Sequence, residues 1–156
     1  MIIGWPSIVW LMLVSLVAWS PLSWSQSDPL SKYRWDRRPL LVFAADAEDP
    51  SLKQLRVAIE AASCEIADRD MVIGFILDRG ESRLDGASMS PAAAEAIRSS
   101  LRVKRSEFSA VLVGKDGGAK ARYGQAPSLD AVFSLIDSMP MRRTEMRKKS
   151  AGCEQH

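Results

Sequence analysis

The sequence predicts one α/β domain in which helices flank a central mixed β-sheet. Three short apolar runs are typical of strands buried on both faces: 40–44, 71–77 and 110–114. Three other segments repeat apolar residues every three or four positions, as helices packed by one face do; they begin at Pro50, Ser90 and Ser128. A Gly117-Gly118 pair after the third run predicts a tight turn and a β-hairpin.

The first strand, Leu40–Ala44, is followed by an acidic loop and then by a helix beginning at Pro50. Proline is favoured in the first helical turn, and acidic residues stabilise the positive end of a helix. The helix carries one apolar stripe facing the sheet: Leu52, Leu55, Ile59, Ala62 and Ile66. The acids Asp46, Glu48 and Asp49 are therefore explained without a metal, since a calcium loop needs more oxygen ligands and a glycine.

The second strand, Met71–Leu77, returns parallel to the first through a right-handed crossover. Asp78 and Arg79 then lie at its carboxyl end, beside the crevice that begins at Asp46. Asp85-Gly86 predicts a small intruding hairpin, and Ser90-Pro91 caps the next helix.

The third strand, Ala110–Gly114, is followed by the glycine turn and an antiparallel edge strand, Ala119–Tyr123. The last helix is capped by Ser128 and ends at Pro140. The resulting order, β-α-β-α-β-β-α, is that of a thioredoxin-like core, and few other small folds share it.

The position where thioredoxins and peroxiredoxins carry their reactive thiolate holds no sulfur here. That thiolate lies at the mouth of the first helix, whose positive end lowers its pKa, but residues 44–52 contain no cysteine. Cys64 comes more than three helical turns later, and residues 107–109 lack the cis-proline that usually precedes the hairpin. The single histidine is the last residue, His156. We therefore expect no catalytic residues, no metal and no cofactor.

The composition of the chain and its N-terminal sequence limit which partners and which cellular compartment we expect. The chain has 156 residues, 47% of them apolar, and a net charge of +2, too small to indicate nucleic acid. Residues 1–25 resemble a signal peptide, with an apolar run at Ile8–Trp19 and small residues at Ser23 and Ser25. We expect export to the periplasm or the medium, a domain over 26–149 and a disordered tail over 150–156.

An uncleaved N-terminal anchor is the alternative, because no cation precedes the apolar run and four follow it. If the leader is removed, no stable membrane insertion is expected. An exported chain meets an oxidising compartment. Its two cysteines, Cys64 and Cys153, are interpreted as unrelated thiols in preference to a disulfide.

The candidate binding residues are aromatic and charged side chains outside the predicted core. Tyr33 and Trp35 would share one face of an extended segment, and a lid over the core is favoured there over a recognition patch. Lys115 lies on the positive rim of the hairpin turn, which is explained first as edge-strand protection. The full set is Tyr33, Arg34, Trp35, Asp46, Arg79, Lys115, Arg142 and Arg143.

Several segments resemble the bacterial members of the DUDES family, a domain of unknown function with a thioredoxin- or peroxiredoxin-like fold. The segments are 33–35, 38–43, 69–72, 113–120 and 136–143, of which Gly114–Gly118 and Met139–Arg142 are the most specific. The resemblance covers 30 to about 149. It implies an exported protein, and in animals related domains occur in secreted, matrix-associated proteins with adhesive roles. It supplies no reaction and no catalytic residue.

The leading hypothesis is an exported domain without redox chemistry that binds a protein or an envelope component. One alternative is a small-molecule enzyme using the crevice groups Asp46, Asp78 and Arg79. The other is a thiol redox protein using Cys64, or a redox sensor using Cys64 and Cys153.

Overall fold

The computed structural model describes residues 28–148, which contain one six-stranded sheet in the order β4-β3-β2-β1-β5-β6. β1 (Arg38–Ala44) pairs parallel to β2 (Met71–Leu77) and antiparallel to β5 (Ser109–Val113), which pairs with β6 (Ala119–Tyr123). The predicted small hairpin is β3 (Arg83–Leu84) with β4 (Ala87–Ser88), added beside β2. The mixed sheet and the thioredoxin-like order are confirmed.

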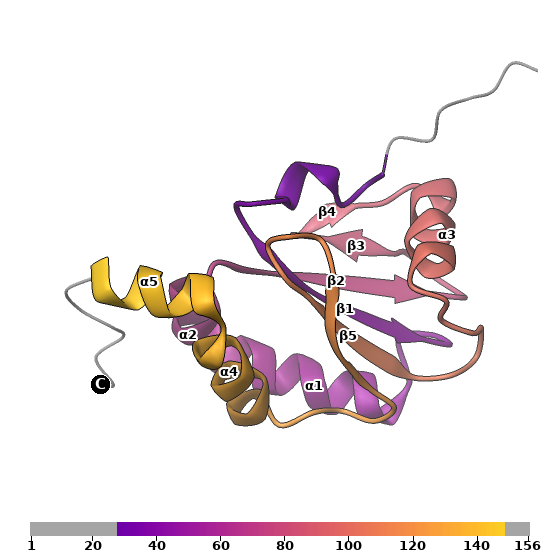
Figure 1. Cartoon of the computed structure of the whole chain (residues 1–156). Helices are drawn as coiled ribbons and strands as arrows, with labels where there is room; N and C mark the ends of the chain where they lie inside the picture. The colour runs from indigo at the N-terminus through magenta and orange to yellow at the C-terminus, as the bar shows by residue number, and fades with distance from the viewer. Residues whose placement is uncertain (1–27, 149–156) are drawn as a thin grey trace, which may run out of the picture.

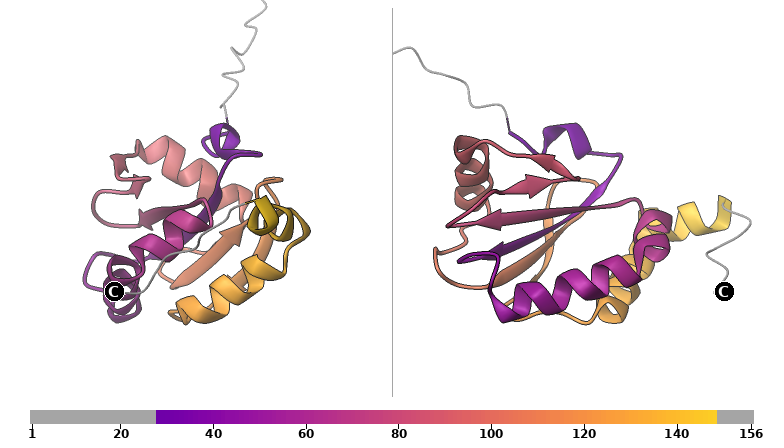
Figure 2. Two further views of the ribbon diagram at one scale, coloured as in Figure 1. Left: turned by 90° about the vertical axis from the view of Figure 1, so that its left-hand side faces the viewer. Right: turned by 180° about the vertical axis from the view of Figure 1, so that it is seen from behind.

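Helices cover both faces of the sheet (Figures 1 and 2). α1 (Pro50–Ala61), α2 (Ser63–Asp68) and α4 (Leu129–Ser138) lie on one face. α3 (Pro91–Ser100) and the short 3-10 helix η1 (Ser31–Tyr33) lie on the other. The arrangement is a three-layer α/β domain.

The core consists of two apolar clusters separated by the sheet, because alternate residues of a strand point to opposite faces. On β1, Leu40 and Val42 belong to the cluster under α1 and α4, whereas Leu41 and Phe43 belong to the cluster under α3. β1 lies between β2 and β5 in the sheet, and every one of its residues is buried, so we treat it as the central strand. Its carboxyl end, where β2 also ends, is called the carboxyl edge below, and the opposite end is the amino edge.

The first strand and the first helix differ in extent from the prediction, and the third strand is shifted by one residue, to Ser109–Val113. The first strand begins at Arg38 and not at Leu40, and it includes Pro39, which a central strand normally excludes. Pairing with β5 starts only at Leu40, so the missing N–H of Pro39 falls beyond that ladder. The continuous helical stripe is divided at Ala62, where φ is −104° and ψ is 29°, so that α2 is a separate short helix.

The prediction of an extended lead-in is wrong. A 3-10 turn at Ser31–Tyr33 places the Tyr33 side chain in the core, 6% exposed. Trp35 has φ of 68°, in the left-handed region, and is 69% exposed. The two aromatics therefore do not share a face.

An unpredicted helix, α5 (Pro140–Lys148), follows α4 after the single extended residue Met139. Pro140 both ends α4 and supplies the fixed φ that suits a helix start. α5 lies beyond the amino edge of the sheet, next to α2 and α4 (Figure 1). Between residues 28 and 148, no helix is long and apolar enough to cross a membrane.

Candidate functional site

The loop from β1 to α1 is occupied by the caps of the helix. The Asp49 carboxylate accepts a hydrogen bond from the Leu52 N–H at 3.1 Å, the usual contact of an N-cap. The Asp46 carboxylate accepts from the Glu48 N–H at 3.0 Å. The acidic residues therefore serve the helix start, as expected from the sequence.

Asp46 and Arg79 come together at the carboxyl edge. Their ion pair, with an N–O distance of 2.5 Å, joins the loop after β1 to the loop after β2, but the Arg79 side chain is 71% exposed. The hydrogen bond from Arg79, with that from the Glu48 N–H, holds the pKa of Asp46 below its ordinary value. This carboxyl group is thus an anion with its own counter-ion, which does not suit it to act as a general acid.

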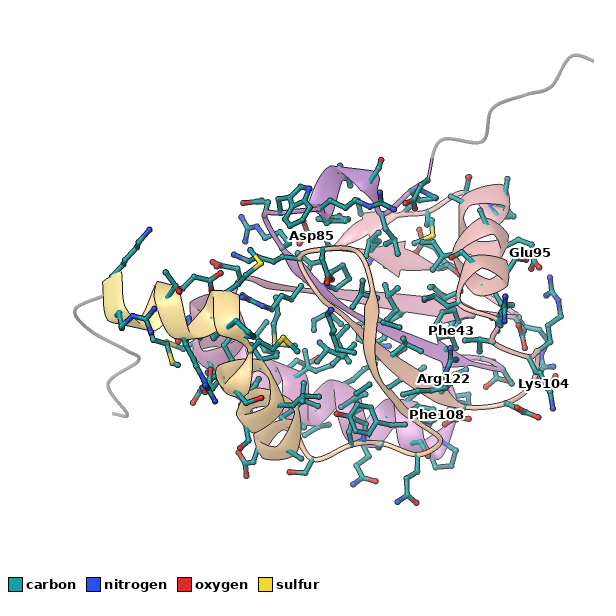
Figure 3. The ribbon with its side chains drawn as sticks, in the orientation of Figure 1. Phe43, Asp85, Glu95, Lys104, Phe108 and Arg122 are labelled. Atoms are coloured by element: carbon teal, nitrogen blue, oxygen red, sulfur yellow. The ribbon has the colours of Figure 1, made fainter. Side chains whose placement is uncertain are left out.

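Asp78 faces a different arginine, inside the domain. Its carboxylate lies 2.7 Å from Arg98, itself 4% exposed, and accepts from the Ser106 N–H at 2.6 Å. The Arg98 guanidinium also lies 5.2 Å from the ring centre of Phe43, which Figure 3 places on the central strand. The two crevice carboxylates therefore do not converge on one point.

A cavity of about 380 Å³ opens beside this pair, under the start of α3. Its charged lining residues are Asp78, Glu81, Glu95, Arg98 and Arg105. Asp46 and Arg79 are not among the residues that line it. A pocket between Asp46, Asp78 and Arg79, which the small-molecule enzyme hypothesis requires, is not found among the described cavities.

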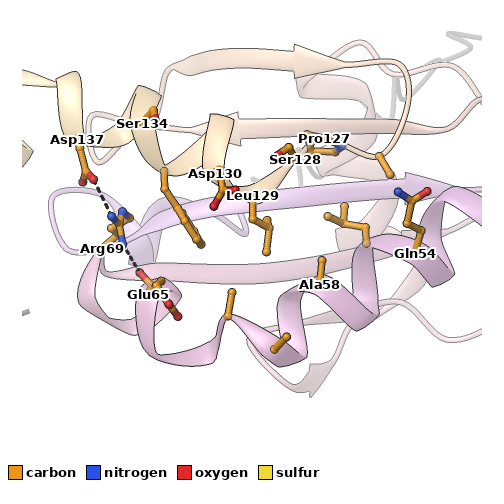
Figure 4. A pocket seen from close by; sticks show the side chains of 15 residues that line it. Gln54, Ala58, Glu65, Arg69, Pro127, Ser128, Leu129, Asp130, Ser134 and Asp137 are labelled. Atoms are coloured by element: carbon orange, nitrogen blue, oxygen red, sulfur yellow. Dashed lines mark hydrogen bonds and ion pairs between the residues drawn. The ribbon is translucent and has the colours of Figure 1, made fainter. Parts of the chain in front are cut away.

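A second hollow, of about 850 Å³, runs between α1, α2 and α4 (Figure 4). Ala58 and Ala61 of α1, with Ala62 directly after that helix, form part of one wall, and Leu129 and Phe133 of α4 form part of the other. One end is crossed by the Arg69–Asp137 ion pair at 2.6 Å, with the Arg69 guanidinium 4.5 Å from the Phe133 ring centre. The groove therefore has a mixed lining, with apolar side chains at its centre and polar or charged ones such as Gln54, Asp130 and Glu65 along it.

The amino edge holds a group of four charges, two buried cations and two half-buried carboxylates, which we call the amino-edge cluster: Arg38, Asp70, Lys115 and Glu145. Arg38 is 1% exposed and Lys115 is 9% exposed, and each places a nitrogen 2.9 Å from the same oxygen, Oε1 of Glu145. Lys115 also pairs with Asp70 at 2.9 Å, and Arg38 donates to the Arg69 carbonyl at 2.9 Å. The cluster joins the start of β1, the start of β2, the β5–β6 turn and α5.

A second set of ion pairs lies one helical turn away on α5. The Arg142 guanidinium is 3% exposed and bonds the carboxylates of Asp68 and, at 3.1 Å, Asp137. Burial alone would raise the pKa of Asp137, but hydrogen bonds from Arg69 and Arg142 outweigh it, so the pKa lies below 3.8. Arg142 thus bonds α5 to α2 and α4, while Glu145 bonds α5 to β1 and the β5–β6 turn.

The predicted binding residues divide between the two edges. Asp46 and Arg79 lie at the carboxyl edge. The remaining six lie in the segments around the amino edge: Tyr33, Arg34, Trp35, Lys115, Arg142 and Arg143. Of these six, Tyr33, Lys115 and Arg142 are buried, while Trp35 and Arg143 are exposed. Arg34 is half exposed, pairs with Asp28 at 3.2 Å and lies over Gly117.

Sequence reasoning missed Arg38, Asp70 and Glu145 as members of one cluster. A signal for the first two was present, since a charged residue directly precedes or opens each of two buried, paired strands. Glu145 gave none, because the polar pattern of 140–148 did not indicate a helix folded back on the domain.

Cys64 lies on the exposed side of α2, away from the carboxyl edge. It is not a free thiol in the structure. Cys153 and the tail over 150–156 lie outside the described residues, as does the leader over 1–25. Within 28–148, no three or more metal-ligating side chains gather in a way that could hold a metal ion.

Residues 29–145 match the model of a family described as a domain of unknown function, DUF4174. The chain belongs to that family. The expectation of a family of unknown function is confirmed in this form, and the match does not carry the name DUDES.

Curated relatives of this DUF4174 chain are much longer proteins. Coiled-coil domain-containing protein 80 from Danio rerio is 29% identical over 133 residues, covering 75% of this chain and 15% of that protein. Sushi repeat-containing protein SRPX from Homo sapiens is 28% identical over 150 residues, covering 83% of this chain and 32% of that protein. The chain therefore corresponds to a minor part of each.

Among solved structures, Prx1a from Plasmodium yoelii is similar to this DUF4174 chain with a TM-score of 0.50 and 16% identity. The match covers 80% of this chain and 83% of that one. At this identity the likeness shows the fold alone, in agreement with the strand order described above.

Proposed function

We propose that the chain is an exported thioredoxin-like domain that acts by binding, as a non-catalytic interaction module of the cell envelope. The observation that carries the proposal is the state of the β1–α1 loop. Where this fold would present a reactive thiolate, the loop offers capping carboxylates and the Asp46–Arg79 ion pair, and residues 44–52 contain no cysteine.

The relatives support a modular role. This chain corresponds to 15% of one and 32% of another, and the names of these proteins describe coiled-coil and sushi-repeat regions. A domain that recurs beside different accompanying regions suits a binding unit that other parts of a protein position.

The partner is a protein or an envelope component that meets the amino-edge surface around Trp35. A tryptophan that is 69% exposed is unusual, because aromatic side chains contribute more than most to binding when they become buried. Its left-handed φ of 68° is costly for a bulky residue, and such strain concentrates at functional sites. Arg34 beside it and Arg143 on α5 supply positive charge.

The test is covalent cross-linking of the exported chain in its native envelope, followed by identification of the captured species. Wild type and W35A are compared with V57A, which removes another large exposed apolar side chain, on α1, 68% exposed. We expect one species to be captured by wild type and V57A and lost in W35A. Equal capture by all three variants would place the partner elsewhere.

Turnover is tested separately. We expect the exported protein to show no insulin reduction and no peroxidase activity above the level of a C64S variant. Activity that disappears in C64S would overturn the proposal in favour of thiol redox chemistry. Cell fractionation with an intact-mass measurement checks export and removal of residues 1–25.

A further inference from the structure

The amino-edge cluster has the geometry of an occupied carboxylate site. Two nearly fully buried cations, Arg38 and Lys115, converge at 2.9 Å each on one oxygen of Glu145. Two cations on one carboxylate oxygen form the kind of charge-assisted contact by which proteins recognise acidic groups. We propose that Arg38 and Lys115 form a binding site for an acidic side chain of a protein partner, and that Glu145 of α5 occupies this site in cis.

The charges favour a replacement anion when Glu145 leaves. The cluster of two cations and two carboxylates is neutral as it stands. Without Glu145 it carries one net positive charge, with Arg38 1% exposed and therefore costly to leave unpaired. Asp70 does not substitute for Glu145 at Arg38, since its nearest oxygen is 3.9 Å away.

Glu145 itself fills the site incompletely. Its second oxygen, Oε2, is buried and makes no hydrogen bond in the structure. An unsatisfied buried acceptor is a cost that a ligand bringing its own donors beside the carboxylate would avoid. The present occupant is therefore one that a better-fitting acid can displace.

The contacts and the linker of α5 would allow this helix to detach from the domain. Arg142 is its one buried residue among the described positions 140–148, so ionic contacts and not apolar packing hold it to the domain. A single extended residue, Met139, joins it to α4 and can absorb a change of direction. Release of α5 would uncover Arg38 and Lys115 without disturbing the sheet.

Trp35 lies at the margin of the site. Its backbone N–H donates to the carbonyl oxygen of Lys115 at 2.6 Å, which holds the backbone of this exposed tryptophan beside the backbone of Lys115. The partner segment that fits this surface thus combines an acidic residue for the two cations with an apolar neighbour for the indole. This inference rests on the proposed binding function and names the chemistry of its partner.

The probe is the blocked peptide acetyl-Leu-Glu-Leu-amide, with acetyl-Leu-Gln-Leu-amide as its uncharged match. Binding to the exported chain is followed by NMR through the indole N–H signal of Trp35, the one tryptophan after residue 25. We expect E145A to bind the glutamate peptide at least about tenfold more tightly than wild type, because a cis occupant present nine-tenths of the time lowers apparent affinity by that factor.

The controls locate the effect. E60A, which removes an exposed glutamate of α1, should bind as wild type does, and K115M with E145A should lose the gain. If E145A binds the glutamate peptide no more tightly than wild type, or no better than the glutamine peptide, the proposal is overturned.

A second measurement needs no variant. In wild type, excess glutamate peptide should speed hydrogen exchange of the backbone amides at 144–148 and leave β1 and β2 unchanged. If α5 exchange is unaffected, the cis occupancy is refuted even where E145A fails to fold. Capture of a partner through Trp35 without this acid preference would refute the inference and leave the proposed function standing. Binding of the glutamate peptide without a captured partner would support the inference and contradict the proposed function.

Discussion

Arg142 shows how a single side chain can decide the attachment of an element. Its guanidinium is 3% exposed and bonds Asp68, the carbonyl of Asp68 and Asp137. Removing one partner of a buried ion pair is costly because the other charge remains desolvated. The neighbouring Arg143 has the same charge but is exposed.

We predict that R142M lowers the free energy of unfolding by about 2 to 3 kcal/mol, the value of hydrogen bonds to charged groups, since Asp68 and Asp137 keep some access to water. R143M should change it by less than about 0.5 kcal/mol. Urea unfolding of both variants measures the difference. Equal effects would mean that Arg142 is not bonded as described.

The sequence could not distinguish these two arginines, nor show that Lys115 is buried. Each lies in a polar stretch, and the carboxylates that pair with Arg142 and Lys115 include residues 45 and 74 positions away. Periodicity reports which face of an element is apolar, but it carries no information on a charge buried by an ionic partner from a distant segment. Capping was predictable because it is local, as Asp49 and Ser90 show.

At the scale of elements, the docking of α5 depends on charge. Burial alone would raise the pKa of Glu145, but hydrogen bonds from Arg38 and Lys115 outweigh it, so the pKa lies below 4.5. The pKa of Asp137 is also lowered. A carboxyl group with a depressed folded-state pKa contributes stability that is complete above its unfolded-state pKa and is lost as the pH falls through the folded value.

We predict that the free energy of unfolding falls as the pH is lowered from about 6 to about 3, and that E145Q shows a shallower fall than wild type because one of the titrating groups is gone. E60Q, at an exposed position of α1, should keep the wild-type slope. Urea unfolding at several pH values measures the three slopes. A slope in E145Q equal to that of wild type would contradict the role of Glu145.

The sheet depends on a close approach at Gly74 of β2. A Cβ at this position would lie 2.8 Å from Leu41 Cδ2 and 2.9 Å from Leu84 Cδ1, too near for either. At Gly124, which follows β6, a Cβ would meet nothing within 4 Å.

We predict that G74A destabilises the domain by about 1 to 3 kcal/mol through overpacking. G124A should be neutral or stabilising by a few tenths of a kcal/mol, because it restricts the unfolded chain without straining the folded one. Thermal unfolding of the two variants tests this pair. A neutral G74A would show that the two leucines can move aside.

At the scale of the whole molecule, the order of strands and helices was predictable from the sequence, but the packing of the C-terminal helix α5 against the domain was not. Three buried runs, two helix caps and one glycine turn define the thioredoxin-like sheet, because each signal is local and all agree. The division of the first helix at Ala62 and the return of the chain as α5 follow from packing against distant residues. The binding surface was only partly foreseen for the same reason: Trp35 was a candidate, but its orientation depends on a 3-10 turn.

The paired state of Cys64 on α2 bears on whether the chain contains a disulfide. It lies on α2, is exposed and is not a free thiol, and the chain has one other cysteine, Cys153. An intramolecular bridge between them would close a loop of about 90 residues and, in the chain-entropy account, stabilise the fold by about 4.6 kcal/mol. Because Cys64 is not a free thiol, we favour a disulfide between Cys64 and Cys153 over the two unrelated thiols expected from the sequence.

We therefore predict that the exported protein, isolated without reductant, contains one disulfide and no alkylatable thiol. Digestion under non-reducing conditions should yield a linked peptide containing Cys64 and Cys153. C153S should unfold at a lower urea concentration than wild type, and reductant should lower the wild-type midpoint to match it while leaving C153S unchanged. Alkylation of both cysteines in the native exported protein would instead show them to be independent, and α2 would then be held to the domain by packing and its ion pairs alone.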